Sequence, residues 1–479
     1  MNYDDALSDE DREIIKQYEE VVAQGRSDYF DVDDMEMIIE HYLFDEKGDD
    51  LKKAEQALEY AFKFHPGDSN LYCQQAAIYL AQNKPKKALA LLDRYRDHDD
   101  NVHTFNHAEA LCRVRRRDEG VAEFKQLVEN VAADDDYDVS ALCNDILRVL
   151  TDYVDLEDGE DAPSKKDFKD TLYFYDKILA LDPNNTDTMN AKAATLDIIG
   201  QRDEAIALCN RSIDLNPYSV DTWHQLSTIH FCAHQYAEAL SDCNYALAID
   251  PNDLQALGDK ADCEYNLQDF ENCIATLKKY LKLDKDDGCM WYLLARCYEQ
   301  QQEPENARKA YKKAVAITPE DDVSWYGIAE ASLYLHDTKE MKRSIKKALA
   351  LRPEDPSYLL IWANVLRDEK KIEECEAMLQ HILKDLKPDF AAAWKLYGDL
   401  ALDCDDCIKA QSYYEKAIEL CKEQGIDIFD IYFFACIAAY SNKDYEKAQE
   451  YFDIAKERNS FTPMLIQRIF KDAKKHLKL

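Results

Sequence analysis

Two pairs of histidines have the spacing at which side chains can share a metal ion. His103 and His107 lie four residues apart, and so do His230 and His234, with Cys232 between them. Residues four apart on a helix project from the same face, as in two-histidine zinc sites. His230, however, falls at a position that a large ring occupies elsewhere in the chain, and His234 falls in a turn. We therefore predict structural roles for these histidines and no bound metal.

One pair of cysteines, Cys404 and Cys407, forms a C-D-D-C sequence. This spacing supports thiol redox chemistry in a βαβ setting, and zinc binding when a second pair of ligands is present. Neither context is found here, so an acidic turn is the favoured interpretation. The sequence also lacks a Gly-rich phosphate loop, a nucleophile elbow and an HExxH sequence. We predict no catalytic residues and no cofactor, and therefore a protein that is not an enzyme.

The elements that carry these residues are predicted to be helices. Among 479 residues there are only 11 Gly and 12 Pro, which is few for a chain of strands and tight turns. The length exceeds what one hydrophobic core supports, so several domains or a repeat array are expected.

A 34-residue repeat is visible from the spacing of four prolines, Pro217, Pro251, Pro319 and Pro353. In the unit 288–321 the recurring residues are Trp291, Leu294, Ala295, Tyr298, Ala307, Tyr311, Ala314 and Pro319. The units 220–253 and 322–355 carry apolar or small residues at most of the same offsets. The first four positions fall at i, i+3, i+4 and i+7, which makes one apolar helix face, and the later ones make a second. Proline then ends the second helix.

These residues resemble the tetratricopeptide repeat family, whose pattern is W-x2-L-G-x2-Y, then A-x3-F, A and P. The resemblance covers roughly residues 35–459, and it is to a large, acidic array of the bacterial type. It implies an all-α fold, an α-solenoid forming a right-handed superhelix of about 12 helix-turn-helix repeats with helical caps at both ends. One pair cannot bury its apolar stripe alone, so each pair must stack on the next.

The chain divides into five expected parts. They are an acidic N-terminal capping helix in 1–34, repeats 1–3 in 35–134, an atypical repeat in 135–185, repeats 5–12 in 186–459, and a C-terminal capping helix in 460–479. The two caps are centred on residues 10–24 and 463–478. The atypical repeat has helices at 139–154 and 166–182, joined by an extended acidic loop at 155–166. That loop is interpreted as a surface loop, with a partner-binding insertion as the alternative.

The resemblance also implies where a ligand would bind, because in this family the first helices line a concave groove that holds peptides. By matching offsets, the groove residues expected here are Asn190, His224, Phe231, Tyr265, Tyr292, Arg296, Tyr326, Tyr334, Asn364, Arg367, Lys395 and Phe433. Further inward positions include Asp262, Glu299, Glu330 and Asp399. Aromatic and charged side chains together suit recognition of a protein segment. The alternative is that the rings pack between repeats, in which case Tyr292→Ala with Tyr326→Ala would lower the melting temperature.

Other features of the family are weak or absent. The places where some members clamp a C-terminal carboxylate hold no basic residues, so such a clamp is not expected. Lysines and arginines recur on the second helices, at Lys278, Lys309, Lys313, Arg343 and Lys347 among others. This basic stripe is interpreted as a solvated outer face, with docking of an acidic region of another copy as the alternative.

Charge and cysteine content limit the remaining possibilities. The net charge of −37 is concentrated in 1–50 and 129–161, and it disfavours nucleic acid and anionic membranes as partners. No signal peptide or membrane span is recognised, and the 15 Cys lack a disulfide spacing, so a reduced cytoplasmic protein is expected. We predict a scaffold or adaptor that binds a protein or peptide segment, with a self-associating homo-oligomeric array as the alternative.

Overall fold

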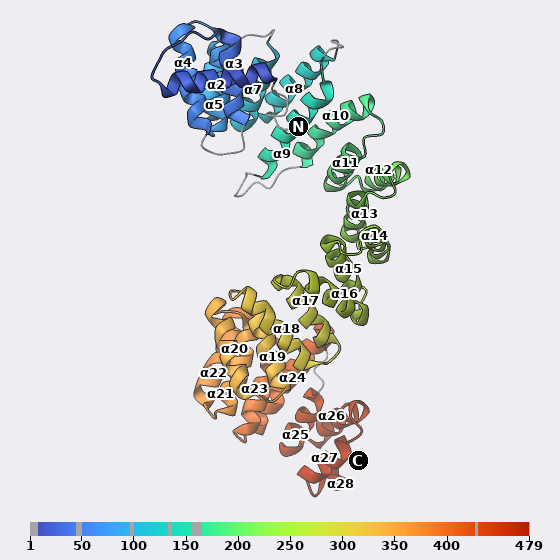
Figure 1. Ribbon diagram of the computed structural model, residues 1–479. Helices are drawn as coiled ribbons and strands as arrows, with labels where there is room; N and C mark the ends of the chain where they lie inside the picture. Colours follow the sequence, from blue (N-terminus) through green and yellow to red (C-terminus); the bar gives the residue numbers. More distant parts are fainter. Residues whose placement is uncertain are drawn as a thin grey trace. The chain divides into compact units, whose positions relative to one another are not determined.

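The computed structural model describes residues 8–44, 50–95, 100–132, 137–155, 165–426 and 430–478. Every regular element within those ranges is a helix, as the ribbon in Figure 1 shows. The prediction of an all-α solenoid is therefore confirmed. Residues 156–164, which make up most of the predicted acidic loop, lie outside the described part of the chain.

The helices fall into two compact units, residues 1–233 and 234–479. Those of unit 1 are α2 (Asp9–Ala23), α3 (Val32–Phe44), α4 (Asp50–Phe64), α5 (Ser69–Ala81), α6 (Pro85–Arg94), α7 (Asn101–Arg113), α8 (Arg117–Val131), α9 (Val139–Asp155), α10 (Lys165–Leu181), α11 (Thr186–Ile199), α12 (Arg202–Leu215) and α13 (Val220–Cys232). Helices α2, α9 and α10 lie where the sequence predicts the N-terminal helix and the two helices of residues 135–185.

The helices of unit 2 follow in the same way. They are α14 (Tyr236–Ile249), α15 (Leu254–Asn266), α16 (Phe270–Leu283), α17 (Gly288–Gln300), α18 (Pro304–Ile317), α19 (Asp322–Tyr334), α20 (Thr338–Leu351), α21 (Pro356–Asp368), α22 (Ile372–His381) with the π-helical turn η1 (Ile382–Leu386), α23 (Ala391–Asp403), α24 (Cys407–Gln424), α25 (Ile431–Ser441), α26 (Tyr445–Arg458), α27 (Thr462–Ile469) and α28 (Ala473–His476).

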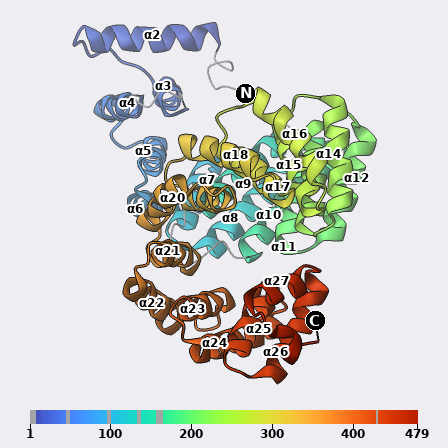
Figure 2. The ribbon, with the colours of Figure 1, turned by 90° about the horizontal axis from the view of Figure 1, so that it is seen from below.

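Helices α3 to α26 match the twelve predicted pairs, with odd-numbered first helices and even-numbered second helices. In Figure 2 the pairs from α21 to α26 follow one another in chain order, each beside the pair before it. The contacts agree, because α23 packs on α24, α24 on α25 and α25 on α26. Each of these pairs thus covers the apolar face of its neighbour, as a repeat array requires.

The six consecutive first helices from α11 to α21 each begin at a capping side chain that recurs with the repeat. The cap accepts a hydrogen bond from a backbone N–H of the first turn and so satisfies a donor that the helix leaves open. The capping residues at 34-residue spacing are Asn185, Ser219, Asp253, Asp287, Asp321 and Asp355. The helix starts are therefore encoded locally.

The turn between the two helices of a pair places one residue in the left-handed backbone region. Gly200 has φ of 91°, and the equivalent residues are His234, Gln268, Gln302, His336 and Lys370, with φ between 55° and 62°. The prediction that His234 belongs to a turn is confirmed.

Tryptophan at the fourth position of a repeat ties the first helix to the turn before it. The indole N–H of Trp325 donates to the carbonyl of Pro319, 2.9 Å away, and Trp223 and Trp394 make the same bond with Pro217 and Pro388. Trp291 makes it with Lys285, which stands at the proline position of its repeat. The ring thus fixes the spacing of neighbouring pairs and keeps its donor satisfied.

Small residues allow the two helices of a pair to approach closely. Ala295 and Ala307 are fully buried, and the equivalent pair in unit 1 is Ala108 with Gly120. Eleven of the 15 cysteines are buried free thiols within these contacts, as expected for small core residues. Burial raises the pKa of the Cys436 thiol to about 12, which keeps it protonated and unreactive near neutral pH.

One extra residue in the repeat that ends at Pro388 is absorbed by a π-helical turn. Trp394 lies 35 residues after the equivalent Leu359, and the preceding helix ends with η1. There the Lys387 N–H donates to the Ile382 carbonyl, 2.7 Å away, five residues earlier. A π-turn accommodates one residue more than the α-helix without breaking the backbone ladder.

The predicted single helix at 463–478 is wrong, because the structure has two short helices, α27 and α28, in its place. Phe470, between them, stacks on Tyr440 of α25 with ring centroids 4.2 Å apart. The Tyr440 hydroxyl donates to Asp472, 2.9 Å away, and Ala473 is fully buried. Burial of this segment against α25 outweighs the local preference for one continuous helix.

Glu36 in α3 makes the stability of unit 1 dependent on pH. Burial raises the pKa of its carboxyl to about 7, and Oε1 has no hydrogen-bond partner among the described residues. Since the folded-state pKa lies above the unfolded one, ionisation costs stability as the pH rises from about 4.5 to 7. We expect Glu36→Gln to be more stable than the wild type by about 1 kcal/mol at pH 8, a figure reduced for the half-exposed side chain.

At pH 5 we expect most of this gain to be absent, because the folded-state carboxyl is then still protonated and pH 5 lies only slightly above the unfolded-state pKa of 4.5. Urea unfolding at the two pH values measures the difference. An equal gain in stability at pH 5 and pH 8 would show that ionisation of Glu36 does not cause the gain.

Candidate functional site

Three consecutive first helices of unit 2 bring together four of the expected groove residues and two of the further inward positions. We call Tyr265, Tyr292, Arg296, Glu299, Tyr326 and Glu330 the first-helix cluster; they lie on α15, α17 and α19, and all are half-buried. Arg296 joins its members, because Nη2 lies 3.4 Å from the Tyr265 hydroxyl and Nε lies 3.8 Å from Glu299 Oε2. Repeat stacking is what aligns these side chains, since each of the three helices supplies one tyrosine to the cluster.

The first-helix cluster holds carboxylates that are poorly compensated. Burial raises the pKa of Glu299 and that of Glu330, and each is opposed by Arg296, while the Glu299 charge raises the pKa of Glu330 further. Asp262, on α15, also has a pKa raised by burial and by Asp259. A half-buried surface with more carboxylates than cations favours a positively charged partner group.

The tyrosines of the first-helix cluster also pack against the repeat core. Tyr292 lies 5.9 Å from Tyr311 of α18, measured between ring centroids. Tyr326 stacks on Tyr358 of α21 with centroids 5.0 Å apart. Their removal would therefore combine a packing loss with any binding loss, and carboxylate substitutions are the cleaner probe. Tyr334, at the end of α19, is 71% exposed.

Arg367 and Lys395, also expected groove residues, are both held by the Asp399 carboxylate of α23, which is the helix that carries Lys395. Asp399 is 8% exposed and accepts from Arg367 at 3.1 Å, from Lys395 at 2.9 Å and from the Tyr414 hydroxyl at 2.7 Å. Arg367 also pairs with Asp403 at 3.0 Å. These contacts join α21, α23 and α24, so this part of the expected groove has a structural role.

The remaining expected groove residues are not part of the first-helix cluster. Asn364 donates to the Leu360 carbonyl of its own helix at 3.1 Å, and Phe433 is half-buried beside Phe434. In unit 1, Asn190 donates to Thr222 at 2.9 Å, His224 is 7% exposed and Phe231 is half-buried.

The histidine pairs have polar protein partners. His107 Nδ1 lies 2.6 Å from Glu123 and its Nε2 lies 3.2 Å from Asp93, and the hydrogen bond to Glu123 raises the pKa of His107. His103 Nε2 lies 3.1 Å from the Leu92 carbonyl. In the described ranges no group of three or more His, Cys, Asp or Glu is placed to hold a metal.

Cys404 and Cys407 are free thiols at the turn before α24. Asp405 has φ of 58°, and Asp406 caps α24 by accepting from the Lys409 N–H. The acidic turn favoured from the sequence is therefore confirmed. Among the residues that the structure describes, no helix is both long and apolar enough to cross a membrane.

Tyr311 was not expected at the site, because its offset marks it as a core residue of a second helix. It is 1% exposed, yet a hydrogen bond between its hydroxyl and Glu299 places it under the first-helix cluster. A hydroxyl at a fully buried position is the signal that could have identified it, since such a group needs a partner.

Family models for the tetratricopeptide repeat match residues 232–297 and 290–321. No curated protein matches the chain. The chain is similar in fold to the solved APC/C hetero-tetramer Cut9–Hcn1, with 13% identity, 97% of each chain covered and a TM-score of 0.43.

Two further solved structures have shorter overlaps. One is a tetratricopeptide repeat protein from Parabacteroides merdae, with 17% identity, 53% of this chain and 98% of that chain covered, and a TM-score of 0.40. The other is YrrB, described as having an unusual peptide-binding site, with 13% identity, 39% and 95% covered, and a TM-score of 0.36. At such low TM-scores these likenesses carry no information about function.

Proposed function

Because the chain is a tetratricopeptide-repeat protein, we propose that it is a non-enzymatic scaffold or adaptor that holds a protein or peptide segment against its first helices. The repeat fold in general supports protein–protein interaction. The first-helix cluster is the observation that carries the proposal for this chain. It combines three half-buried tyrosines with two carboxylates whose pKa values are raised by burial.

The segment that fits this surface carries a lysine or arginine next to an apolar or aromatic residue. A cation would relieve the electrostatic cost of Glu299 and Glu330, and the tyrosine rings would cover the neighbouring side chain. A partner of this kind is more consistent with the net charge of −37 than a second copy, because two such chains repel each other. Nucleic acid and anionic membranes are disfavoured as partners for the same reason. We also propose a cytoplasmic location.

Glu299→Gln combined with Glu330→Gln tests the proposal. We expect this variant to lose partners that the wild type captures from its native cell extract, because two carboxylates are removed at constant volume. Quantitative mass spectrometry of the captured proteins is the measurement. Folding should be retained, since two ionised groups with raised pKa values are replaced by neutral ones.

Glu271→Gln with Glu305→Gln is the matched control, because these exposed residues carry the same two charges on second helices α16 and α18. Its captured proteins should equal those of the wild type. If both double variants lose the same proteins, general electrostatics explains the capture and the first-helix site is rejected. Light scattering on the purified protein separates this proposal from the self-associating array.

A further inference from the structure

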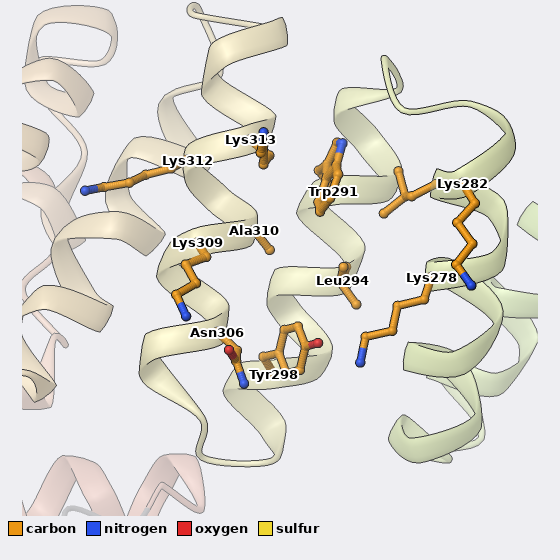
Figure 3. A pocket seen from close by; sticks show the side chains of 11 residues that line it. Lys278, Lys282, Trp291, Leu294, Tyr298, Asn306, Lys309, Ala310, Lys312 and Lys313 are labelled. Carbon is orange, nitrogen blue, oxygen red and sulfur yellow. The ribbon is translucent and has the colours of Figure 1, made fainter.

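A hollow of about 640 Å³ lies between α16, α17 and α18, on the side to which the second helices contribute. Its lining residues are Lys278, Leu281, Lys282, Trp291, Leu294, Tyr298, Asn306, Lys309, Ala310, Lys312 and Lys313. We call it the lysine hollow. Figure 3 shows Trp291, Leu294 and Tyr298 of α17 between lysines of α16 on one side and of α18 on the other.

The charge of the lysine hollow is opposite to that of the chain. Five of its eleven lining residues are lysines and none is acidic, whereas the chain has 96 Asp and Glu against 59 Lys and Arg. Lys312 pairs with Glu340 at 2.8 Å and points away from the hollow in Figure 3. Lys282, Lys309 and Lys313 form no ion pair within the described residues. These three cations are therefore available to anionic groups.

The residues of α17 that line the lysine hollow offer apolar surface, and the indole N–H of Trp291 already has a hydrogen-bond acceptor within the chain. The Trp291 indole N–H donates to the Lys285 carbonyl at 2.9 Å, so the rest of the ring offers apolar surface. Leu294 is 4% exposed beneath it, and the Lys278 ammonium lies 5.6 Å from the centre of the Tyr298 ring. An apolar ligand side chain that covers these residues is stabilised because its surface is removed from water.

We propose that the lysine hollow is a second docking site, for an acidic protein segment that carries a leucine-sized apolar side chain between its carboxylates. The carboxylates pair with the lysines of α16 and α18, and the apolar side chain covers Trp291 and Leu294. Charge complementarity selects this occupant, because an acidic segment is repelled by most of the chain's surface and attracted here. The site uses other helix faces than the first-helix cluster, so one chain can hold a cationic and an acidic segment at once.

The apolar surface of the lysine hollow favours a peptide segment over a bare phosphate group, because a phosphate group has no apolar part to cover that surface. Lysines bind phosphate too, but phosphate sites commonly combine them with backbone N–H groups of a helix N-terminus or with the fork of an arginine, and the lining of the hollow includes no arginine. Lysine ammonium groups on flexible stems suit carboxylates spread along a peptide.

Fluorescence anisotropy with a labelled peptide of sequence Glu-Asp-Leu-Asp-Glu tests the site on the full chain. Lys309→Gln with Lys313→Gln should weaken its binding about fivefold or more at low salt, because each exposed ion pair contributes about 0.5 kcal/mol. Arg343→Gln with Lys347→Gln is the matched control, since these exposed residues have the same offsets one repeat later, on α20, and do not line the hollow. The control should bind as the wild type does.

Five outcomes would overturn the proposal, and four of them concern the peptide. These four are absence of binding by the wild type, equal loss in both double variants, undiminished binding of a peptide with alanine in place of leucine, and displacement of the peptide by inorganic triphosphate at equal concentration. Self-association that is lost in Lys309→Gln with Lys313→Gln would identify a second copy as the occupant and overturn it too. Thermal melting verifies folding, which surface lysine substitutions should leave unchanged. The Glu299 and Glu330 variant should bind this peptide normally, so the two proposals fail independently.

Discussion

Gly327→Ala is expected to lower the free energy of unfolding of unit 2 by at least about 2 kcal/mol, because it overpacks a closed core. A Cβ at Gly327 in α19 would lie 2.4 Å from both Cε2 and Cζ of Tyr311 and 2.8 Å from Cδ2. Tyr311 is 1% exposed, so its ring has no free space to move into. The helices α18 and α19 must then separate, or the ring must leave its rotamer.

Gly258→Ala is the matched control, since Gly258 also lies within a first helix and also faces a tyrosine ring. A Cβ there would meet Tyr280 Cε2 at 3.7 Å, which is an ordinary van der Waals contact. Because alanine favours the helix, this variant should be more stable than the wild type by about 0.5 kcal/mol. Urea unfolding followed by circular dichroism measures both. Equal stability of the two variants would contradict the close approach at Gly327.

Gly327→Ala is also expected to affect the candidate site. The Tyr311 hydroxyl bonds Glu299, so a displaced Tyr311 ring also withdraws a donor from the first-helix cluster. We therefore expect Gly327→Ala to weaken partner capture as well as stability, whereas Gly258→Ala should leave capture unchanged.

Asp399→Asn should cost about 2 kcal/mol of stability, because it removes the negative charge from a buried ion-pair network. Asp399 is 8% exposed, and Arg367, Lys395 and Tyr414 all donate to it. Asparagine keeps the side-chain volume and one hydrogen-bond acceptor, so the loss of stability measures the contribution of the negative charge. The cost stays below that of a fully buried pair because Arg367 and Lys395 are themselves half-exposed.

Asp403→Asn tests the same network from its exposed side. Asp403 pairs with Arg367 at 3.0 Å but its side chain is 52% exposed. An exposed pair contributes less than about 1 kcal/mol, so this variant should unfold close to the wild type. Thermal and urea unfolding of the two variants, measured side by side, is the test. Equal losses of stability in Asp399→Asn and Asp403→Asn would contradict the structural role of Asp399.

Most of the fold could be predicted from the sequence because its signals are local. The 34-residue period, the twelve pairs and the turn at His234 follow from helix periodicity, capping residues and turn geometry within one repeat. The C-terminal cap could not be predicted, because its break at Phe470 depends on stacking with Tyr440, thirty residues earlier.

The candidate site could be predicted only as a set of helix positions. Helix phase places Arg296 and Arg367 among the inward positions of first helices, but it cannot tell that Glu299 pairs with Arg296 or that Asp399 pairs with Arg367. Such pairing requires the distances between neighbouring repeats and the rotamers of long side chains. The lysine hollow arises in the same way, from α16 and α18 flanking α17.

The sequence by itself determined a stack of helix pairs with an acidic surface, because helix faces, caps and net charge are properties of residues close together in the chain. Only the tertiary structure decided which charges of the first helices neutralise each other and which remain available, because an ion pair forms only where two repeats bring its partners within a few ångströms.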